Sequence, residues 1–171
     1  MSSGRRAFLD ANVVFSAALG GPALELLLDL ARERRIEAMT SVACEREARE
    51  NLSRKRPDRI AALEEILRVI SVEEVETTEH EAWARKLVHH QDVHVLAAAR
   101  ALSTDVLVTG DMTHFGRLMS RSDLLVKVRS LRGFLLEGPE QQVCTPTGSV
   151  LDRWSSKPRE MQPTDTSMAR R

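Results

Sequence analysis

Short apolar runs alternate along this chain with longer segments whose apolar residues recur every three or four positions. The apolar runs predict buried strands at 7–9, 36–40, 69–75, 106–109 and 124–128. The longer segments predict helices at 11–19, 23–35, 41–54, 60–70, 79–89, 91–102 and 131–136, with one or two further helical turns over 113–119. Strands that alternate with helices indicate βαβ units. We therefore expect an α/β fold with a parallel sheet covered by helices on both faces.

Several helix boundaries carry local sequence signals. Gly20-Gly21 ends the first predicted helix, and Pro22 stands where a new helix can begin. Ser41 is a suitable N-cap for the third helix. Thr78-Glu79-His80-Glu81 has the spacing of a capping box, which predicts a helix that opens there.

Two of the predicted strands end on an acid. Asp10 follows the first apolar run, and Asp111 follows Val106-Leu107-Val108-Thr109-Gly110. Ligands of open α/β sheets bind at the carboxyl ends of the strands, so we expect these two carboxylates to meet at one site. A role as helix N-cap would also explain Asp10.

Two further acids are candidates for the same site. Asp92 stands at a predicted N-cap, and capping alone would explain it. Glu47 lies in an acid-rich helix beside Glu45 and Glu50, where a solvated surface role is the simpler interpretation. Several carboxylates in one cleft repel each other unless a cation neutralises them, and oxygen ligands without cysteine select Mg²⁺ or Mn²⁺. Such an ion suits phosphodiester hydrolysis, because it activates water and absorbs charge on the phosphate.

Other chemical patterns are weaker. His90 and His94 have the spacing of a zinc pair, but no HExxH motif is present and Asp92 between them starts a new helix. His114 is interpreted as a residue at the edge of the site rather than as a ligand. The GxSxG, GxGxxG and P-loop patterns are absent, which removes the simplest serine hydrolase, dinucleotide-binding and NTPase interpretations.

A run of basic residues follows Glu47. Such a run is usually a solvated face, but beside an acidic cleft it would also supply countercharge for the phosphates of a nucleic acid. Both interpretations stay open for Arg46, Arg49, Arg54, Lys55, Arg56 and Arg59.

Composition bounds the remaining possibilities. The 171 residues suit one domain, which we place at 1–138, with a flexible tail at 139–171 in which Val150, Leu151 and Trp154 could form a small patch. Lys+Arg and Asp+Glu balance at 25 each, and the 4% aromatic content without tyrosine argues against modules that stack bases on aromatic side chains. Cys44 and Cys144 lie far apart, and Cys44 is interpreted as a buried thiol. No apolar run approaches the length of a membrane span and no signal peptide is recognisable, so we expect a soluble, cytoplasmic protein.

At this point the chain resembles the PIN-domain family of ribonucleases, which includes the VapC-type toxins of bacterial toxin–antitoxin pairs. Four segments carry the resemblance in the right order over about residues 5–136: FLDANVVFSAAL, TSVACEREARENL, QDVHVLAAARAL and DVLVTGDMTHF. Each motif is weak alone, whereas the series of four is specific.

The resemblance implies a three-layer α/β/α sandwich around a mostly parallel five-stranded sheet, with an acidic Mg²⁺ or Mn²⁺ site. It implies metal-binding and catalytic roles for Asp10, Glu47, Asp92 and Asp111, and roles in orienting these acids for Asn12 and Thr109. It also implies an RNA substrate, a homodimer and a possible antitoxin partner. Within the basic run, the candidates for contacts with that RNA are Arg46, Arg49, Arg54 and Lys55. The family often has a further acid two residues after Asp111, where this chain has Thr113, which argues against a second ion and allows a site for one.

Two other functions remain open. A phosphatase of the haloacid dehalogenase type would use Asp10 as a covalent nucleophile, although such enzymes need Asp-x-Asp and this chain has Asn12 at the second position. A module that binds RNA or protein without cleaving is the alternative from a different class.

Overall fold

The computed structural model describes residues 4–138, in which five strands form one parallel sheet. The strands are β1 (Arg5–Leu9), β2 (Ile36–Ser41), β3 (Ser71–Glu73), β4 (Val106–Val108) and β5 (Lys127–Arg129). They lie in the order β3-β2-β1-β4-β5, and every neighbouring pair is parallel. The predicted five-stranded parallel sheet is confirmed.

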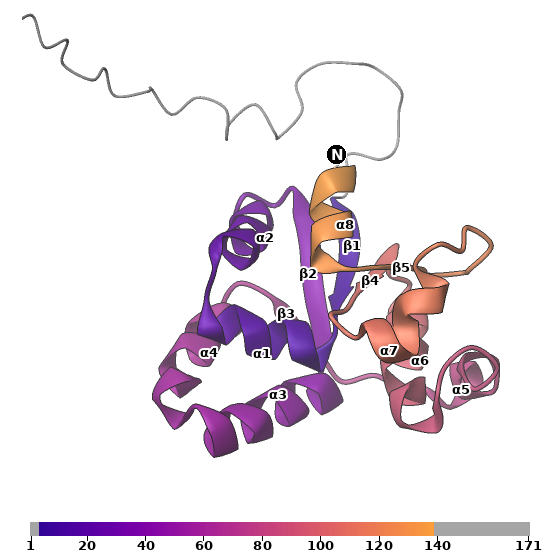
Figure 1. Ribbon diagram of the computed structural model, residues 1–171, viewed down its shortest axis with the longest axis horizontal. Helices are drawn as coiled ribbons and strands as arrows, with labels where there is room; N and C mark the ends of the chain where they lie inside the picture. The colour runs from indigo at the N-terminus through magenta and orange to yellow at the C-terminus, as the bar shows by residue number, and fades with distance from the viewer. Residues whose placement is uncertain (1–3, 139–171) are drawn as a thin grey trace, which may run out of the picture.

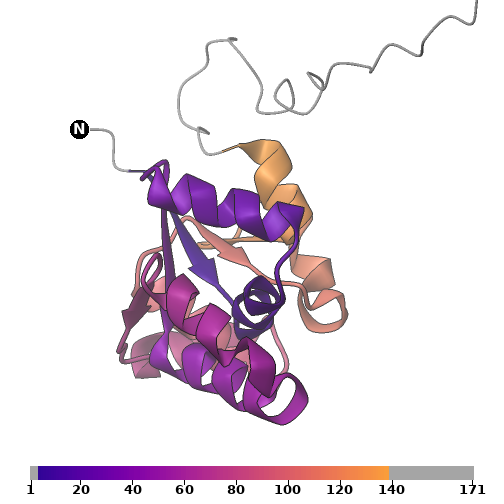
Figure 2. The same cartoon turned by 90° about the vertical axis from the view of Figure 1, so that its left-hand side faces the viewer.

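Helices cover both faces of this sheet and complete the predicted three-layer sandwich (Figure 1). The first face carries α1 (Ala11–Leu19), α2 (Pro22–Arg32), α4 (Ile60–Leu67) and α8 (Leu131–Glu137), together with most of α3 (Val42–Lys55). The second face carries α5 (Thr78–Ala84), α6 (Val93–Ala101) and α7 (Met112–Phe115). Three short 3-10 helices lie between these elements: η1 (Pro57–Arg59), η2 (His90–Asp92) and η3 (Gly116–Leu118). Figure 2 looks onto the first face, with its helices in front of the strands.

Strand periodicity divides the core between the two faces. Ala7 and Leu9 of β1 point into the first cluster, whereas Phe8 between them points into the second. All three residues of β4 are fully buried, as expected for a parallel strand covered on both sides. In α6 the alanines at 97–99 are also buried, which lets this helix lie close to the sheet.

The order of the strands places a crevice between the ends of β1 and β4. These two strands are neighbours, yet the chain leaves them toward opposite faces of the sheet. After β1 it enters α1, whose Val13 and Val14 pack in the first cluster, and after β4 it enters α7, whose Phe115 packs in the second. Open α/β sheets bind ligands at such a topological switch point. The fold therefore indicates that a ligand site would lie beside Asp10 and Asp111.

Most predicted boundaries are confirmed. Helix α1 begins directly after Asp10 and ends at Gly20, which has φ 87°, and Gly21 has φ 129°. These positive φ angles are readily adopted by glycine but strained for other residues, so the pair can turn the chain into Pro22 of α2. The Ser41 side chain accepts a hydrogen bond from the Cys44 amide and caps α3 as predicted.

Several boundary predictions were wrong. Helix α2 ends at Arg32 rather than at 35, and α4 ends at Leu67 rather than at 70. Helix α5 ends at Ala84 rather than His89, because the amides of Lys86 and Leu87 bond to carbonyls only three residues back and tighten the chain into turns. The capping box at Thr78 is absent, since Thr77 is the N-cap and its hydroxyl bonds to the Glu81 carboxylate instead. Strand β5 covers Lys127–Arg129 rather than 124–128, because only these residues pair with Val106–Val108 of β4.

Some predictions fall outside the described residues. The tail at 139–171, the patch of Val150, Leu151 and Trp154, and Cys144 all lie there. Over residues 4–138 no single helix is long and apolar enough to cross a membrane, and only the bent pair α1 and α2, which turns by 106°, meets the length and composition criteria together.

Candidate functional site

Asp10 lies at the centre of a closed hydrogen-bond network at the carboxyl end of β1. Its side chain is 5% exposed, and its Oδ1 accepts a bond from the Ala11 amide at 2.7 Å. Its Oδ2 accepts from the Thr109 hydroxyl at 2.6 Å and from the Asn12 Nδ2 at 2.7 Å. Both carboxylate oxygens therefore have protein partners.

The same network joins β1 to the loop after β4. The Thr109 Oγ1 accepts a bond from the Asp111 amide at 3.1 Å, and the Asn12 Oδ1 accepts from the Gly110 amide at 2.8 Å. A Cβ on Gly110 would lie 3.3 Å from the Asn12 Oδ1, so the loop approaches Asn12 closely. Thr109 and Asn12 thus connect Asp10 to the backbone that carries Asp111, although 99 residues separate Asp10 from Thr109.

Negative charge accumulates around Asp10. Burial raises the pKa of the Asp10 carboxyl, and the charges of Glu47 and Asp92 raise it further, which outweighs the opposing hydrogen bonds from Thr109 and Ala11. Four acids from separate segments were predicted to converge. Of the other three acids, Glu47 and Asp92 lie close enough to Asp10 for their charges to affect its pKa. The Glu47 side chain is exposed on α3.

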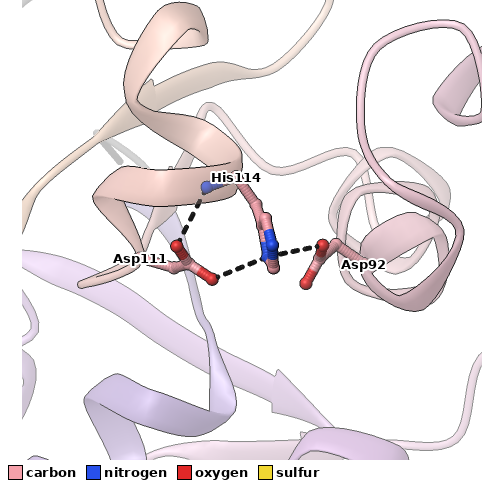
Figure 3. A group of neighbouring side chains, drawn as sticks. All are labelled: Asp92, Asp111 and His114. Atoms are coloured by element: carbon pink, nitrogen blue, oxygen red, sulfur yellow. Dashed lines mark hydrogen bonds and ion pairs between the residues drawn. The ribbon is translucent and has the colours of Figure 1, made fainter.

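Asp92, Asp111 and His114 form a second, different group at the same end of the sheet (Figure 3). The His114 ring lies between the two carboxylates, and its Nδ1 is 3.0 Å from the Asp92 Oδ2 and 3.0 Å from the Asp111 Oδ2. The Asp111 Oδ1 accepts bonds from the amides of Thr113 and His114 and so caps α7. This cap leaves the Asp111 Oδ2 directed at His114.

The inner atoms of this group lack hydrogen-bond partners. The Asp92 Oδ2 and the His114 Nδ1 are buried, and neither makes a hydrogen bond of acceptable geometry despite their short separation. Asp92 occupies the N-cap position of α6, but its side chain accepts no capping bond. Capping therefore explains Asp10 and Asp111 in part, whereas it leaves the Asp92 side chain unexplained.

A divalent cation fits this arrangement. Ligand atoms of the three residues all lie within 4.8 Å of one another, and carboxylate oxygen with imidazole nitrogen is a donor set that divalent ions accept. Buried polar atoms without partners are rare in proteins and point to an unseen water or ion. Among the described residues this is the one group with such spacing. It includes neither Asp10 nor Glu47, and neither His90 nor His94.

Cys44 lies near these acids but is a poor ligand. It is fully buried at the start of α3, as predicted. Burial raises the pKa of its thiol to about 11, and the nearby charges of Asp10 and Glu47 add to the rise. The thiol is therefore neutral at physiological pH, and the donors available to an ion are oxygen and nitrogen.

Comparison with protein families gives an independent result. A family model described as "PIN domain" matches residues 6–113, which is more than half of the chain. The chain belongs to the PIN-domain family. The resemblance inferred from the four motifs is thereby confirmed, and the matched range contains Asp10, Glu47, Asp92 and Asp111.

Solved structures share this PIN fold. A structure of VapBC2 from Rickettsia felis bound to a DNA fragment from their promoter matches with a TM-score of 0.59 and 17% identity, over 73% of this chain and 98% of the other. VapBC-1 from nontypeable Haemophilus influenzae matches with a TM-score of 0.52 and 17% identity, over 74% and 98%. DNA-bound VapBC from Salmonella typhimurium gives 0.58 and 16%, over 74% and 98%. At these identities the likeness is one of fold. No curated protein matches the chain.

The basic run of this PIN domain divides into two kinds of residue. Arg49 bonds to the carboxylates of Glu45 and Glu64, and Arg59 donates to the carbonyls of Ala18 and Leu19 at the end of α1. Arg56 pairs with Asp58 in the same way. By contrast the structure gives Arg46, Arg54 and Lys55 no carboxylate partner among the described residues, and all three are exposed on α3, the helix that also carries Glu47. Arg54 donates to the Asn51 Oδ1 at 2.7 Å, and the Lys55 Nζ lies over the Phe15 ring.

An open cavity of about 490 Å³ adjoins Asp111. It extends from the crevice along α1 toward α2 and α8, and it is lined by Asn12, Val13, Ser16, Leu24, Gly110, Asp111 and Leu131. A molecule bound there would therefore contact both α1 and the carboxyl end of the PIN sheet.

His114 is the residue of this site that sequence reasoning undervalued. It was interpreted as an edge residue, and the structure instead directs its Nδ1 between two carboxylates. The available signal was its position in the first turn after Asp111, where the helix turns a side chain back toward its cap. The neighbouring Thr113, at the position where PIN proteins often have an acid, is exposed.

Proposed function

We propose that this PIN-domain protein is a metal-dependent endoribonuclease that uses Mg²⁺ or Mn²⁺, and that it is the toxin of a toxin–antitoxin pair. The observation that carries the nuclease proposal is the pairing of Asp92 with Asp111 at the switch point of the sheet. Their facing oxygens share one neighbour, His114, and the Asp92 Oδ2 is buried without a hydrogen bond.

The acids have different parts in this proposal. Asp92 and Asp111 hold the ion, Asp10 adds its negative charge from the end of β1, and Glu47 ligates the ion or positions the attacking water. The bound ion would lower the pKa of a water and stabilise charge on the phosphate oxygens. Glu47 suits the contact with water because its side chain is exposed. It also lies close enough to Asp10 for its charge to raise the pKa of the Asp10 carboxyl.

Asn12 and Thr109 position the acids. The Thr109 hydroxyl donates to Asp10 and accepts from the Asp111 amide. One hydroxyl therefore fixes the position of the Asp111 backbone relative to the Asp10 carboxylate. Asn12 adds a second connection through Gly110. Ligands held by such partners keep their orientation when substrate arrives.

The substrate would follow the exposed side of α3. Arg46, Arg54 and Lys55 provide countercharge for phosphates, and Arg49 would do so only if it leaves Glu45 or Glu64. The cavity beside Asp111 offers room for a nucleotide next to the reacting phosphate. Because Asp10 is buried with both oxygens bonded, the covalent phosphatase alternative has less support.

The partner proposals rest on the fold of the solved relatives. Those structures contain VapBC pairs, so we propose an antitoxin as the partner of this chain and a homodimer as its own assembly. Co-expression with the product of an adjacent gene, followed by size-exclusion chromatography with light scattering, tests both points.

The decisive experiment measures cleavage of a labelled RNA pool by the full chain. We expect cleavage in Mg²⁺ or Mn²⁺, none in EDTA, and a loss of about 100-fold or more in Asp92→Asn. The matched control is Asp29→Asn on the exposed side of α2, which should cleave as the wild type does. RNA binding in EDTA without cleavage in either metal would favour the non-cleaving module, and a phospho-aspartate at Asp10 would favour the phosphatase.

A further inference from the structure

We infer that His114 is a direct ligand of the divalent ion, through its Nδ1, and that it makes the site favour Mn²⁺ over Mg²⁺. This inference deepens the proposed function and rests on it, because it concerns the same ion. It differs from the acidic site that the resemblance implies, since it adds a nitrogen donor to a set of oxygen donors.

The spacing of the three ligand atoms supports a shared ion. Two ligands at neighbouring vertices of an octahedron, each about 2.1 Å from the ion, lie about 3.0 Å from each other. The His114 Nδ1 is 3.0 Å from the Asp92 Oδ2 and 3.0 Å from the Asp111 Oδ2. The two separations between nitrogen and oxygen thus already match those of neighbouring ligands on one ion, and all three atoms lie within 4.8 Å of one another.

Hydrogen bonding alone does not account for this placement. An imidazole Nδ1 carries at most one proton and can satisfy one acceptor, whereas this nitrogen faces two carboxylate oxygens at equal distance. Neither contact has the geometry of a hydrogen bond, which leaves both the Nδ1 and the Asp92 Oδ2 buried without a partner. One cation between the three atoms would satisfy all of them.

The surroundings hold the His114 ring in place. Its own amide donates to the Asp111 Oδ1 at 3.0 Å, which fixes the start of α7. The ring of His89 stacks on it with centroids 5.7 Å apart and planes 18° apart. The ring orientation therefore comes from packing and from the helix cap.

A nitrogen donor changes the preference for metals. Mg²⁺ favours oxygen ligands and keeps its waters, while later divalent ions accept imidazole more readily. Mn²⁺ accepts both donor types, so the set of Asp92, Asp111 and His114 should bind Mn²⁺ more tightly than Mg²⁺.

Pulsed electron paramagnetic resonance on the full chain loaded with Mn²⁺ tests the assignment. We expect modulation from a directly bound nitrogen in the wild type, and its change on labelling of histidine with ¹⁵N. Both should vanish in His114→Ala and in His114→Gln, which keeps a polar side chain. They should persist in His80→Ala, a histidine of α5 outside the three-residue group.

Calorimetric titration with the bare ions gives the second measurement. We expect His114→Ala to weaken Mn²⁺ binding by about tenfold or more, and Mg²⁺ binding by less, so that the ratio of the two affinities falls. Circular dichroism melting checks that each variant is folded.

The outcomes separate the two proposals. Mn²⁺ bound with oxygen donors alone in the wild type, or a nitrogen signal that survives in both His114 variants, overturns the ligand assignment while the acidic site stands. An ion whose binding is unchanged in Asp92→Asn overturns the metal centre of the proposed function. A nitrogen signal that depends on His114, in a protein that cleaves no RNA, supports the ligand assignment and contradicts the nuclease.

Discussion

Two clusters of polar groups lie at the carboxyl ends of β1 and β4, a buried one around Asp10 and a half-buried one around Asp92, and they differ in their hydrogen bonding. Around Asp10 each carboxylate oxygen has a protein donor, from Ala11, Asn12 or Thr109. Around Asp92 the Oδ2 has none, and the His114 Nδ1, 3.0 Å away, also lacks a hydrogen bond. The first cluster is satisfied by protein groups, and the second would be satisfied by the proposed ion.

This difference assigns separate tasks to acids that look alike in the sequence. A satisfied buried network makes a rigid corner between two strands, because losing one member leaves the others without partners. An unsatisfied pair of carboxylates stores repulsion that a cation can relieve. In the proposed function Asp10 would therefore serve the fold as well as the site, whereas Asp92 would serve the site alone.

The largest expected effect separates these two acids by stability. Replacing Asp10 by Ala strands the donors of Thr109, Asn12 and Ala11, so the free energy of unfolding in EDTA should fall by about 2–4 kcal/mol. Replacing Asp92 by Ala removes no hydrogen bond and relieves repulsion, so stability should stay within about 0.5 kcal/mol or rise. Urea unfolding followed by circular dichroism measures both values.

The control for this comparison is the matched pair of neutral variants, Asp10→Asn and Asp92→Asn. They keep the side-chain volume, so packing effects are small in both. Equal losses in the two alanine variants would mean that Asp92 has a structural partner, and the contrast between the clusters would be lost.

A smaller effect is expected from the hydroxyl that links the clusters. Thr109→Val keeps the shape of a fully buried side chain but removes the donor to Asp10 and the acceptor of the Asp111 amide. Unfolding free energy should fall by about 1–2 kcal/mol. Cleavage at a temperature where the variant is fully folded should also fall, because the loop carrying Asp111 loses its fixed relation to β1.

Thr113→Val provides the control for this substitution. Thr113 is exposed in the first turn of α7, four residues after Thr109, so the same chemical change there should leave stability and cleavage close to the wild type. If Thr109→Val cleaved RNA at the wild-type rate, the hydroxyl would be structural only, and its proposed role in positioning Asp111 would be withdrawn.

The fold was largely predictable from local patterns. Apolar runs and helical periodicity placed all five strands and the main helices, since their spacing reflects which side chains are buried in each element. The acids Asp10 and Asp111 followed from a topological argument, because ligands of parallel sheets bind at the strand ends. Ends of elements were harder. Helix α5 stops at Ala84 through turn hydrogen bonds that periodicity does not encode.

His114 shows why the rest of the site could not be predicted. Its environment depends on Asp92, which is 22 residues earlier and reaches it only through the packing of η2 and α6 beside α7. The same holds for the ion pair of Arg49 with Glu64 on another helix, whereas its pair with Glu45 one helical turn away is visible in the sequence. Tertiary pairing of this kind leaves no periodic signal in the sequence.

The smallest expected effect concerns a third cluster, in which the protein's own cations neutralise a carboxylate. Glu137 of α8 accepts bonds from Arg5 at 2.9 Å and from Arg129. Burial of Glu137 works against ionisation, but these two guanidinium groups outweigh it and hold the pKa of Glu137 below its ordinary value of 4.5. Glu137→Gln should therefore lower the unfolding free energy by about 1 kcal/mol at neutral pH.

This contribution should depend on pH and be independent of metal. A lowered pKa means that the unfolded chain binds more protons, so the stabilisation is present above pH 4.5 and is lost as the pH falls through the pKa of the folded state. The difference between wild type and Glu137→Gln in urea unfolding should thus shrink in acid and be the same in EDTA and in Mn²⁺. Glu25→Gln, on an exposed position of α2, is the control. A difference that changed with Mn²⁺ would show that α8 is coupled to the ion site, and the three clusters could then not be treated as independent.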